Sequence, residues 1–468
     1  MNDGLQVARA ALADRPAWLV GGAVRDRLLG RTLIDLDLVV DGDPEQAARA
    51  SAGAAGRAAC FALSEDFGAW RVVARDRAWQ ADIEQLRGGT LEADLLLRDF
   101  TVNAIAEPIE GGAPIDPLGG LEDLAARRLR MAGAEAFADD PLRVLRLVRM
   151  AVELELEPEA QTSNAAREHA DALQRVSPER VFMELRRIVA SPRARHGIEL
   201  LDVLGATAVV LGELEALKGV EQSRFHHLDV YGHTLEVLDH TIELQADPSA
   251  ALGDEHTADL LALLNEPLAD EMTRGEALRW GVLLHDAAKP LTRGVRPEDG
   301  RVTFIGHDAK GAELARTVLA RLRTSERLRA HVAALVRNHL RLGFLVHEPQ
   351  PLARRTVYTY LRASDPVEVD VTLLSVADRL ATRGDKAQEA IDAHLRVARA
   401  MLKDALSWRA EGPPQPLLRG DELAADLGIP PGPRVGELLG ELTEAQYAGE
   451  IATRDQALAF ARTLTTSG

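Results

Sequence analysis

The chain of 468 residues has a single cysteine, few aromatic side chains and no long apolar run. One cysteine, Cys60, excludes an intrachain disulfide framework and is typical of a reducing compartment. Aromatic residues make up 4% of the chain, so stacking of nucleic-acid bases on aromatic rings can be only a local device. No apolar stretch approaches the roughly 18 residues that a membrane helix needs, and the N-terminus lacks the features of a signal peptide. We therefore expect a soluble, cytoplasmic protein without a membrane partner.

Acidic residues outnumber basic ones, with 73 Asp and Glu against 55 Lys and Arg and a net charge of −18. Taken as an average, this charge opposes a nucleic-acid partner. Two stretches run against the average, because residues 127–149 contain six Arg and three acids, and residues 175–195 contain six Arg and two acids. A phosphate backbone could lie along these stretches. Solvated helix faces are the other interpretation.

The organisation of the chain changes near residue 125. Before it, short apolar runs predict strands at 17–20, 36–40, 60–63, 70–74 and 79–84, with helices at 23–30 and 44–52. After it, apolar residues at helical spacing predict helices, for example within 139–157 and 177–190, and the Pro-rich segment 412–416 marks a linker. We expect an α+β chain, with a small α/β head at 1–125. An all-helical neck (126–220), body (221–385) and tail (386–468) would follow it.

Two aspartates on one predicted strand point to phosphate chemistry. Asp35 and Asp37 project from the same face, and the residue between them packs into the core. Two like charges side by side are costly unless a cation binds them, and Mg²⁺ prefers oxygen ligands and bridges phosphates. Gly21-Gly22, between a strand and a helix, would let backbone N–H groups approach those phosphates. Asp82 is a third candidate carboxylate; a solvated edge strand is the alternative.

Five segments, in order, resemble the motifs of the class II tRNA nucleotidyltransferases and poly(A) polymerases. They are GGAVRD at 21–26 with Asp35-x-Asp37, RDFTVNA at 98–104, DPLGGLEDL at 116–124, DDPLR at 139–143, and Ser-Pro-Glu-Arg at 177–180 with Glu184. Two positions depart from the family pattern: Leu97 stands where it has Arg, and Asp139 where it has Glu. The resemblance implies a polymerase-β-like head.

The resemblance also implies a reaction, in which the RNA 3′-hydroxyl attacks the α-phosphorus of CTP or ATP and pyrophosphate leaves. Asp35, Asp37 and Asp82 would be catalytic, with Mg²⁺ on the first two. Asp140 and Arg143, three apart on one helix, would read the base, while Arg180 and Glu184 would brace the neck helices. The resemblance assigns nucleotide binding to these residues: Gly21, Gly22, Arg25, Arg98, Asp99, Asn103, Asp140, Arg143, Arg146 and Arg149.

A second constellation lies in the predicted body. Imidazole and carboxylate are ligands for transition metals, and an adjacent His-Asp pair can serve two neighbouring ions. The order of these residues resembles the HD phosphohydrolase superfamily. It implies a divalent transition metal of open identity and a phosphodiesterase or phosphatase activity; a scaffold without activity is the alternative. The expected ligands are His233, His285, Asp286 and Asp378, with His307 and His339 as further ligands of a two-metal centre.

Three functions therefore compete. The first is addition of CCA to the tRNA 3′ end from CTP and ATP without a nucleic-acid template. The second is a polymerase of the same family that adds only the terminal A, or poly(A). The third is an HD phosphohydrolase whose head merely binds nucleotides or RNA, which the intact Asp35, Asp37, Asp140 and Arg143 oppose.

The segment between the third carboxylate and the RDFTVNA motif bears on the choice between the first two. Only Ile83 to Leu97 is available, which is short for the family and resembles members that add only A, and Gly88-Gly89 is its one obvious pivot. We predict that A is added to tRNA ending in CC at least as readily as C is added to tRNA lacking all of CCA.

Overall fold

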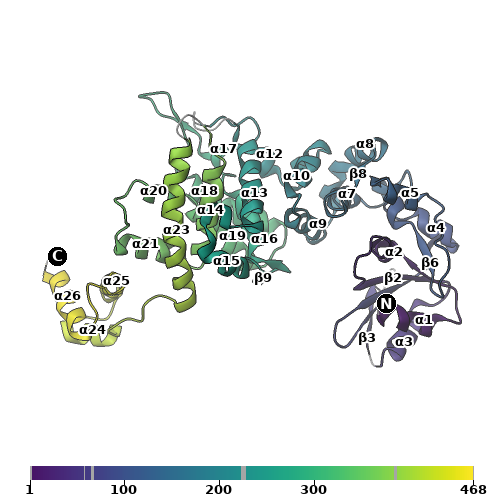
Figure 1. The fold of residues 1–468 in the computed structure, drawn as a ribbon, viewed down its shortest axis with the longest axis horizontal. Helices are drawn as coiled ribbons and strands as arrows, with labels where there is room; N and C mark the ends of the chain where they lie inside the picture. The colour runs from purple at the N-terminus through teal and green to yellow at the C-terminus, as the bar shows by residue number, and fades with distance from the viewer. Residues whose placement is uncertain (1–2, 57, 65–67, 223–227, 384–386, 467–468) are drawn as a thin grey trace. The chain divides into compact units, whose positions relative to one another are not determined.

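The computed structural model describes residues 3–56, 58–64, 68–222, 228–383 and 387–466. The chain divides into two compact units, residues 1–210 and 211–468, and each is described by itself (Figure 1). None of the described helices combines the length and the apolar character that a membrane crossing requires.

The first unit opens with a six-stranded mixed sheet in the order β3-β4-β5-β2-β1-β6. β2 runs parallel to β5, and the other neighbours in the sheet are antiparallel. The strands are β1 (Ala17–Val20), β2 (Asp35–Val40), β3 (Ala59–Ser64), β4 (Ala69–Val73), β5 (Gln80–Gln85) and β6 (Ala106–Pro108). The helices around the sheet are α1 (Asp3–Leu12), α2 (Gly21–Leu28), α3 (Pro44–Ala54), α4 (Leu91–Leu96) and α5 (Gly120–Ala125).

Alternation along the strands sends their side chains to two different cores. Leu36 and Leu38 of β2 face a core shared with α1 and α3. Val39 faces the other side of the sheet, where it packs with Leu95 of α4. The second face therefore also carries Asp35 and Asp37, which share the orientation of Val39 along the strand.

Helices dominate the rest of the first unit, as predicted. They are α6 (Ala136–Asp139), α7 (Arg143–Leu154), α8 (Ala160–His169), α9 (Pro178–Ala190), α10 (Ala194–Val203) and α11 (Ala206–Val210). One short strand pair, β7 (Arg128–Leu129) with β8 (Glu157–Pro158), interrupts the all-helical pattern.

The second unit is helical apart from two short strand pairs, β9 (Pro267–Ala269) with β10 (Met272–Thr273) and β11 (Gly294–Val295) with β12 (Val302–Thr303). Its central helices are α13 (Val230–Ala246), α16 (Arg274–Leu284), α18 (His307–Arg321), α19 (Glu326–Asn338), α22 (Glu368–Leu380) and α23 (Ala387–Glu411). Shorter helices join them: α12 (Gly212–Glu215), α14 (Ser249–Leu252), α15 (Thr257–Leu264), α17 (Lys289–Thr292), α20 (Arg341–Leu345) and α21 (Arg354–Ser364).

The C-terminal helices have a hydrophobic core of their own, which includes Leu423, Leu438 and Ala457. These helices are α24 (Gly420–Leu427), α25 (Pro433–Tyr447) and α26 (Arg454–Thr466). The Pro-rich segment 412–416 lies between the end of α23 and the start of α24, so the predicted linker is confirmed. The strand pairs of both units were not predicted, because strands of two or three residues leave no period in a sequence.

Candidate functional sites

The parallel pairing of β2 with β5 gathers carboxylates on one face of the sheet. Asp37 lies in register with Asp82, and Asp35 precedes Asp37 by two residues on the same face. Glu84 follows Asp82 by two residues and lines the same pocket of ≈ 170 Å³ as Asp37 and Asp82. The sequence reasoning missed Glu84, although the strand period that selected Asp82 also selects it.

The charge on Asp37 is unfavourable in the protein alone. Burial raises the pKa of Asp37; the Arg98 guanidinium opposes this shift, and the nearby carboxylates of Asp82, Glu84 and Asp35 raise the pKa further. A group of carboxylates that disfavour one another's charge fits a divalent cation, which would relieve the repulsion. The oxygen-only donor set suits a hard ion such as Mg²⁺.

Asp82 is not a free ligand in this structure. The guanidinium of Arg71, on the neighbouring strand β4, donates from two nitrogens to its two oxygens, both at 2.7 Å. Such a two-pronged pair is strong and directional. Each oxygen of Asp82 keeps a second lone pair, so Asp82 can bind a cation only from the side that faces away from Arg71 unless this pair opens.

Both the backbone conformation and the close packing at position 21 require a glycine, Gly21. Its φ of +67° is a conformation that side chains with a Cβ rarely adopt. A Cβ there would lie 2.9 Å from a guanidinium nitrogen of Arg98 and 3.1 Å from a carboxylate oxygen of Asp37. With Gly22 it opens α2, so backbone N–H groups face the acidic pocket at a helix N-terminus.

A buried aspartate, Asp99, organises the cationic wall of the pocket. It accepts from Asn103 Nδ2 at 2.8 Å and from the Phe100 N–H at 2.8 Å, and it pairs with Arg146 at 2.7 Å. Burial alone would raise its pKa, but the Arg146 guanidinium and these hydrogen bonds lower it to about 2. Asn103 in turn accepts from Arg25 at 2.6 Å. Four of the predicted nucleotide-binding residues are thus joined in one chain of hydrogen bonds and ion pairs: Arg25, Asn103, Asp99 and Arg146.

A second buried carboxylate, Asp94 of α4, ties down the segment from Ile83 to Leu97. One of its oxygens accepts from the backbone N–H of Arg87 at 3.2 Å and from its Nε at 2.9 Å. The other accepts from Arg98 Nε at 3.2 Å and Nη2 at 2.9 Å. The segment has little slack, because β5 ends at Gln85, a tight turn occupies Arg87–Gly89 and α4 begins at Leu91.

The two expected base readers do not share a helix, which corrects the prediction. Asp140 is extended, with φ −145° and ψ 102°, and α7 begins only at Arg143. The cause is Pro141, since a proline disfavours the helical conformation of the residue before it.

The side chains of both base readers are held by other groups. Asp140 accepts from Arg180 at 2.7 Å, while Arg143 donates to the backbone oxygens of Leu97 at 2.8 Å and Ala136 at 3.0 Å. Neither side chain lines the acidic pocket. Arg143 is thereby attached to the last residue of the short segment.

Ion pairs hold most of the Arg side chains in the two basic stretches. Arg149 pairs with Glu184 of α9 at 2.5 Å and with Glu153 at 3.0 Å, so it braces α7 against α9. Glu184 therefore has its expected bracing role, and Arg149 is turned toward acids, although it also lines a pocket of ≈ 300 Å³ next to Asp37. Binding of a phosphate backbone along these stretches stays a prediction.

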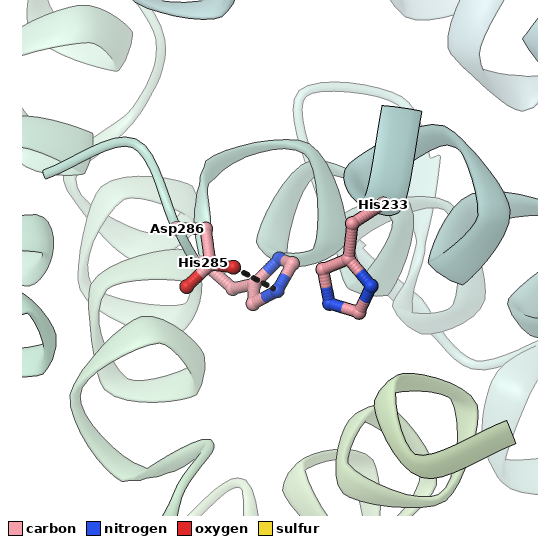
Figure 2. Close-up of side chains that lie close together, drawn as sticks. All are labelled: His233, His285 and Asp286. Carbon is pink, nitrogen blue, oxygen red and sulfur yellow. Dashed lines mark ion pairs between the residues drawn. The ribbon is translucent and has the colours of Figure 1, made fainter. Parts of the chain in front are cut away.

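The second unit brings the predicted histidines together. His233 comes from α13, His285 and Asp286 follow α16, and Figure 2 shows the two imidazole rings side by side. Their ring centroids lie 5.9 Å apart, and that of His339 lies 5.3 Å from that of His285. The Nε2 atoms of His307 and His339 face each other at 3.3 Å.

Backbone carbonyls set the tautomers of three of these rings. Nδ1 lies 2.7 Å from the carbonyl of the residue three positions earlier in His285, His307 and His339. Because only a protonated nitrogen can donate there, Nε2 carries the lone pair in His307 and His339 when these rings are neutral. Two such lone pairs at 3.3 Å repel each other unless a cation lies between them, which fits a metal. Nε2 of His285 lies 3.2 Å from Asp286, and although burial lowers the pKa of His285, the Asp286 charge raises it above the usual value.

Two groups of ligand atoms share one carboxylate. His233, His285 and Asp286 form the first group, and Asp286, His307 and His339 the second, with the atoms of each within 4.8 Å of one another. A carboxylate common to two groups is the arrangement that a pair of ions needs.

The charges of this cluster are mixed. Burial and the neighbouring His285 lower the pKa of His339 to about 4, so this ring is neutral near pH 7. Asp378 belongs to neither ligand group; it lies 2.9 Å from Nε2 of His233. The sequence reasoning missed Lys289, whose ammonium lies 2.6 Å from Asp286.

Comparisons with known proteins agree with this division of sites. The family described as "Poly A polymerase head domain" matches residues 17–130, and "Probable RNA and SrmB- binding site of polymerase A" matches residues 155–218. The family described as "HD domain" matches residues 230–383. The carboxylate pocket lies within the first match and the histidine cluster within the third.

Two relatives and one solved structure cover nearly the whole chain. The A-adding tRNA nucleotidyltransferase of Deinococcus radiodurans is 39% identical over 449 residues, which are 95% of this chain and 94% of the relative. The CC-adding tRNA nucleotidyltransferase of Thermus thermophilus is 39% identical over 453 residues, 95% and 93% of the two chains. The structure of the Bacillus stearothermophilus CCA-adding enzyme in complex with CTP has a TM-score of 0.64 at 21% identity and covers 100% and 99% of the two chains.

Proposed function

The chain belongs to the family of tRNA nucleotidyltransferases and poly(A) polymerases with an HD domain, and from this premise we propose that it extends the 3′ end of tRNA from CTP or ATP without a template. The observation that carries the proposal is the pairing of β2 with β5, which sets Asp37 beside Asp82 under the Gly21-Gly22 turn. The head (1–125) would transfer the nucleotide, and the neck (126–220) would read the base and bind RNA. The HD body (221–385) and the tail (386–468) would follow.

In the head, the residues of the pocket would bind and orient the triphosphate. Backbone N–H groups at the start of α2 and the guanidinium groups of Arg98 and Arg146 offer donors to phosphate oxygens. Asp99 fixes Arg146 and Asn103, so these donors need little rearrangement on binding. Asp35 and Asp37, with Asp82 beside them, would hold Mg²⁺, which when bound lowers the pKa of the attacking hydroxyl and neutralises charge on the phosphates.

We propose further that the base-reading residues keep one fixed arrangement, which we call a single setting of the nucleotide pocket. Arg143 donates to the Leu97 carbonyl, and Asp94 fixes the segment that ends at Leu97 to both Arg87 and Arg98. An enzyme that adds C twice and then A must change its base-reading residues between steps, and gating of this kind needs a segment that can move. A segment held at both ends supports addition of one kind of nucleotide.

That nucleotide is A or C. Addition of the terminal A follows the prediction made from the short segment and the similarity to an A-adding relative. Addition of CC is the second candidate, and the CC-adding relative, at the same 39% identity, favours it equally.

The test uses three tRNA transcripts that end at the discriminator base, at C and at CC, each with CTP alone, ATP alone or both. A single setting predicts that only one triphosphate supports extension, either ATP on the transcript that ends in CC or CTP on the transcripts that end at the discriminator base and at C. Complete stepwise addition of CCA to the first transcript would refute the single setting. Extension of none of them would refute the nucleotidyltransferase itself.

We propose a metal-dependent phosphohydrolase as a second function of the same chain. The supporting observation is the pair of ligand groups that share Asp286, with Nε2 lone pairs directed inward. Bound divalent ions would supply a nucleophilic water for attack on a phosphoester. Loading with Mn²⁺, Ni²⁺ or Co²⁺ and assay on 4-nitrophenyl phosphate and its bis ester tests this function, and no hydrolysis with any of the three ions would leave the domain a scaffold.

A further inference from the structure

A large pocket opens on the histidine cluster from one side. It has a volume of ≈ 720 Å³ and includes His307, a ligand of the second group, in its wall. The hairpin of β11 and β12, the start of α18 and the helix α20 surround it. The volume is within the range of pockets that hold small organic ligands.

The wall of this pocket is basic in a chain whose net charge is −18. The described lining residues include five cations and one acid, Asp308, which pairs with Arg337 at 2.6 Å. Arg301 and Arg341 form no ion pair with any residue that the structure describes. Positive charge without an acidic partner among the described residues is the chemistry of a polyanion site. The five cations are Lys289, Arg296, Arg301, Arg337 and Arg341.

Apolar side chains stand in the same wall where water reaches them. Ile305 is 84% exposed and Phe344 is 66% exposed, the two highest values among the large apolar residues that the structure describes. Phe304 also lines the pocket. Exposed rings beside arginines are the combination on which unpaired bases stack.

Lys289 connects the pocket with the metal ligands. Lys289 is 8% exposed, its ammonium lies 2.6 Å from Asp286, and this ammonium lies 5.5 Å from the centre of the Phe304 ring. A phosphate at the histidine cluster would therefore meet this ammonium as well. The remaining cations lie on the hairpin, α19 and α20, where they can meet further phosphates.

We propose that this pocket binds a ribonucleotide unit with at least two phosphate groups, one of them at the histidine cluster and its base against Phe344 and Ile305. The proposal deepens the phosphohydrolase function proposed above and rests on it for the place of the first phosphate. A nucleoside polyphosphate and the phosphorylated end of a single-stranded RNA share this chemistry.

Two probes separate these two sources, adenosine 5′-(α,β-methylene)diphosphate and an RNA tetranucleotide with a 3′-terminal phosphate. Hydrogen exchange of the full-length protein is read at residues 294–305 and 341–345, so nucleotide bound in the head does not enter the signal. We expect slower exchange in both stretches with one or both probes, and the more effective probe identifies the source. Unchanged exchange with both probes at millimolar concentration would overturn the proposal.

Variants test which residues hold the ligand, with affinity measured from the same exchange signal. Arg301→Ala and Phe344→Ala should each weaken binding about tenfold. The loss in Arg301→Ala should be smaller at high salt, because salt screens the contact between this arginine and a phosphate. Arg293→Ala is the matched control, because Arg293 is an exposed arginine beside the hairpin that does not line the pocket. Equal losses in all three variants, or none, would contradict the assignment.

Hydrolysis of 4-nitrophenyl phosphate by the metal-loaded wild-type protein reports on the centre and not on the pocket. If the protein hydrolyses 4-nitrophenyl phosphate but neither probe slows hydrogen exchange, the ligand assigned to the pocket is refuted and the phosphohydrolase function is not. Protection without hydrolysis would refute the phosphohydrolase function and leave the pocket as a binding site.

Discussion

Asp94 fixes the short segment through two arginines, and one of these two contacts can be removed while the other stays. A variant that removes one contact is therefore the sharpest test of the single-setting proposal. Asp94 is fully buried and accepts hydrogen bonds from two guanidinium groups. Arg87→Ala removes one of these groups and leaves Arg98 in place. Asp94→Asn weakens both, because an amide directs N–H groups toward one of the two cations.

The expected losses of stability differ between the two variants. A buried carboxylate that loses its charge between two cations costs about 3–5 kcal/mol, which is a large part of the about 5–15 kcal/mol of an ordinary domain. The half-exposed Arg87 should cost less, about 1 kcal/mol. Arg87→Ala should therefore fold normally, while Asp94→Asn should melt several degrees lower.

The informative assay is the ratio of kcat/KM for CTP to kcat/KM for ATP on matched tRNA transcripts. If the held segment fixes the setting of Arg143, Arg87→Ala should change this ratio at least tenfold, which is about 1.4 kcal/mol of discrimination. Arg49→Ala is the control, because it removes an exposed ion pair of α3 on the opposite side of the sheet. A ratio within twofold of the wild-type value in Arg87→Ala would refute the reasoning.

Three further predictions follow from the charges of the two sites. Asp37→Asn should lower nucleotide addition by at least about a hundredfold without lowering the melting temperature, since burial raises the pKa of Asp37 and disfavours its charge; a large fall in melting temperature would indicate a structural role. The pKa of about 2 of Asp99 lies below that of an unfolded aspartate, so its stabilisation is complete above about pH 5 and is lost as the pH falls toward 2. Asp99→Asn should therefore cost about 2 kcal/mol in urea unfolding at pH 7 and much less at pH 2, and an equal cost at both values would contradict the shift. His285→Ala with Asp286→Ala should abolish transition-metal binding, measured as metal content after dialysis, and leave nucleotide addition unchanged; retained metal would place the ligands elsewhere.

The head could be predicted from the sequence because alternation marks its strands. The predicted strands at 17–20 and 36–40 match β1 and β2 to within one residue. The pairing of Arg71 with Asp82 could not be predicted, since it depends on the register of β4 against β5, which no local pattern fixes. The extended conformation of Asp140 agrees with the preference that Pro141 imposes on the residue before it, whereas the spacing of three residues to Arg143 suggests a shared helix.

The sequence predicts the histidine cluster as a set of metal ligands, and the backbone carbonyls that contact these rings explain why the histidines occupy these positions. His285 and His339 follow directly on the last residues of α16 and α19. The final carbonyls of a helix lack partners in the helix, and two of them, from Val282 and Val336, accept from the Nδ1 atoms of these rings. The same helix ends would place partial negative charge beside any divalent ions bound there.

Main-chain oxygens orient the imidazole rings here, as carboxylates orient histidine ligands in many metal sites. No side-chain substitution removes such an oxygen, so variants of the positions that supply the carbonyls should keep their metal affinity as long as the helices end where they do. A proline at Asn338 would be the exception. It removes a backbone N–H from the last turn of α19 and so disturbs the helix end that orients His339.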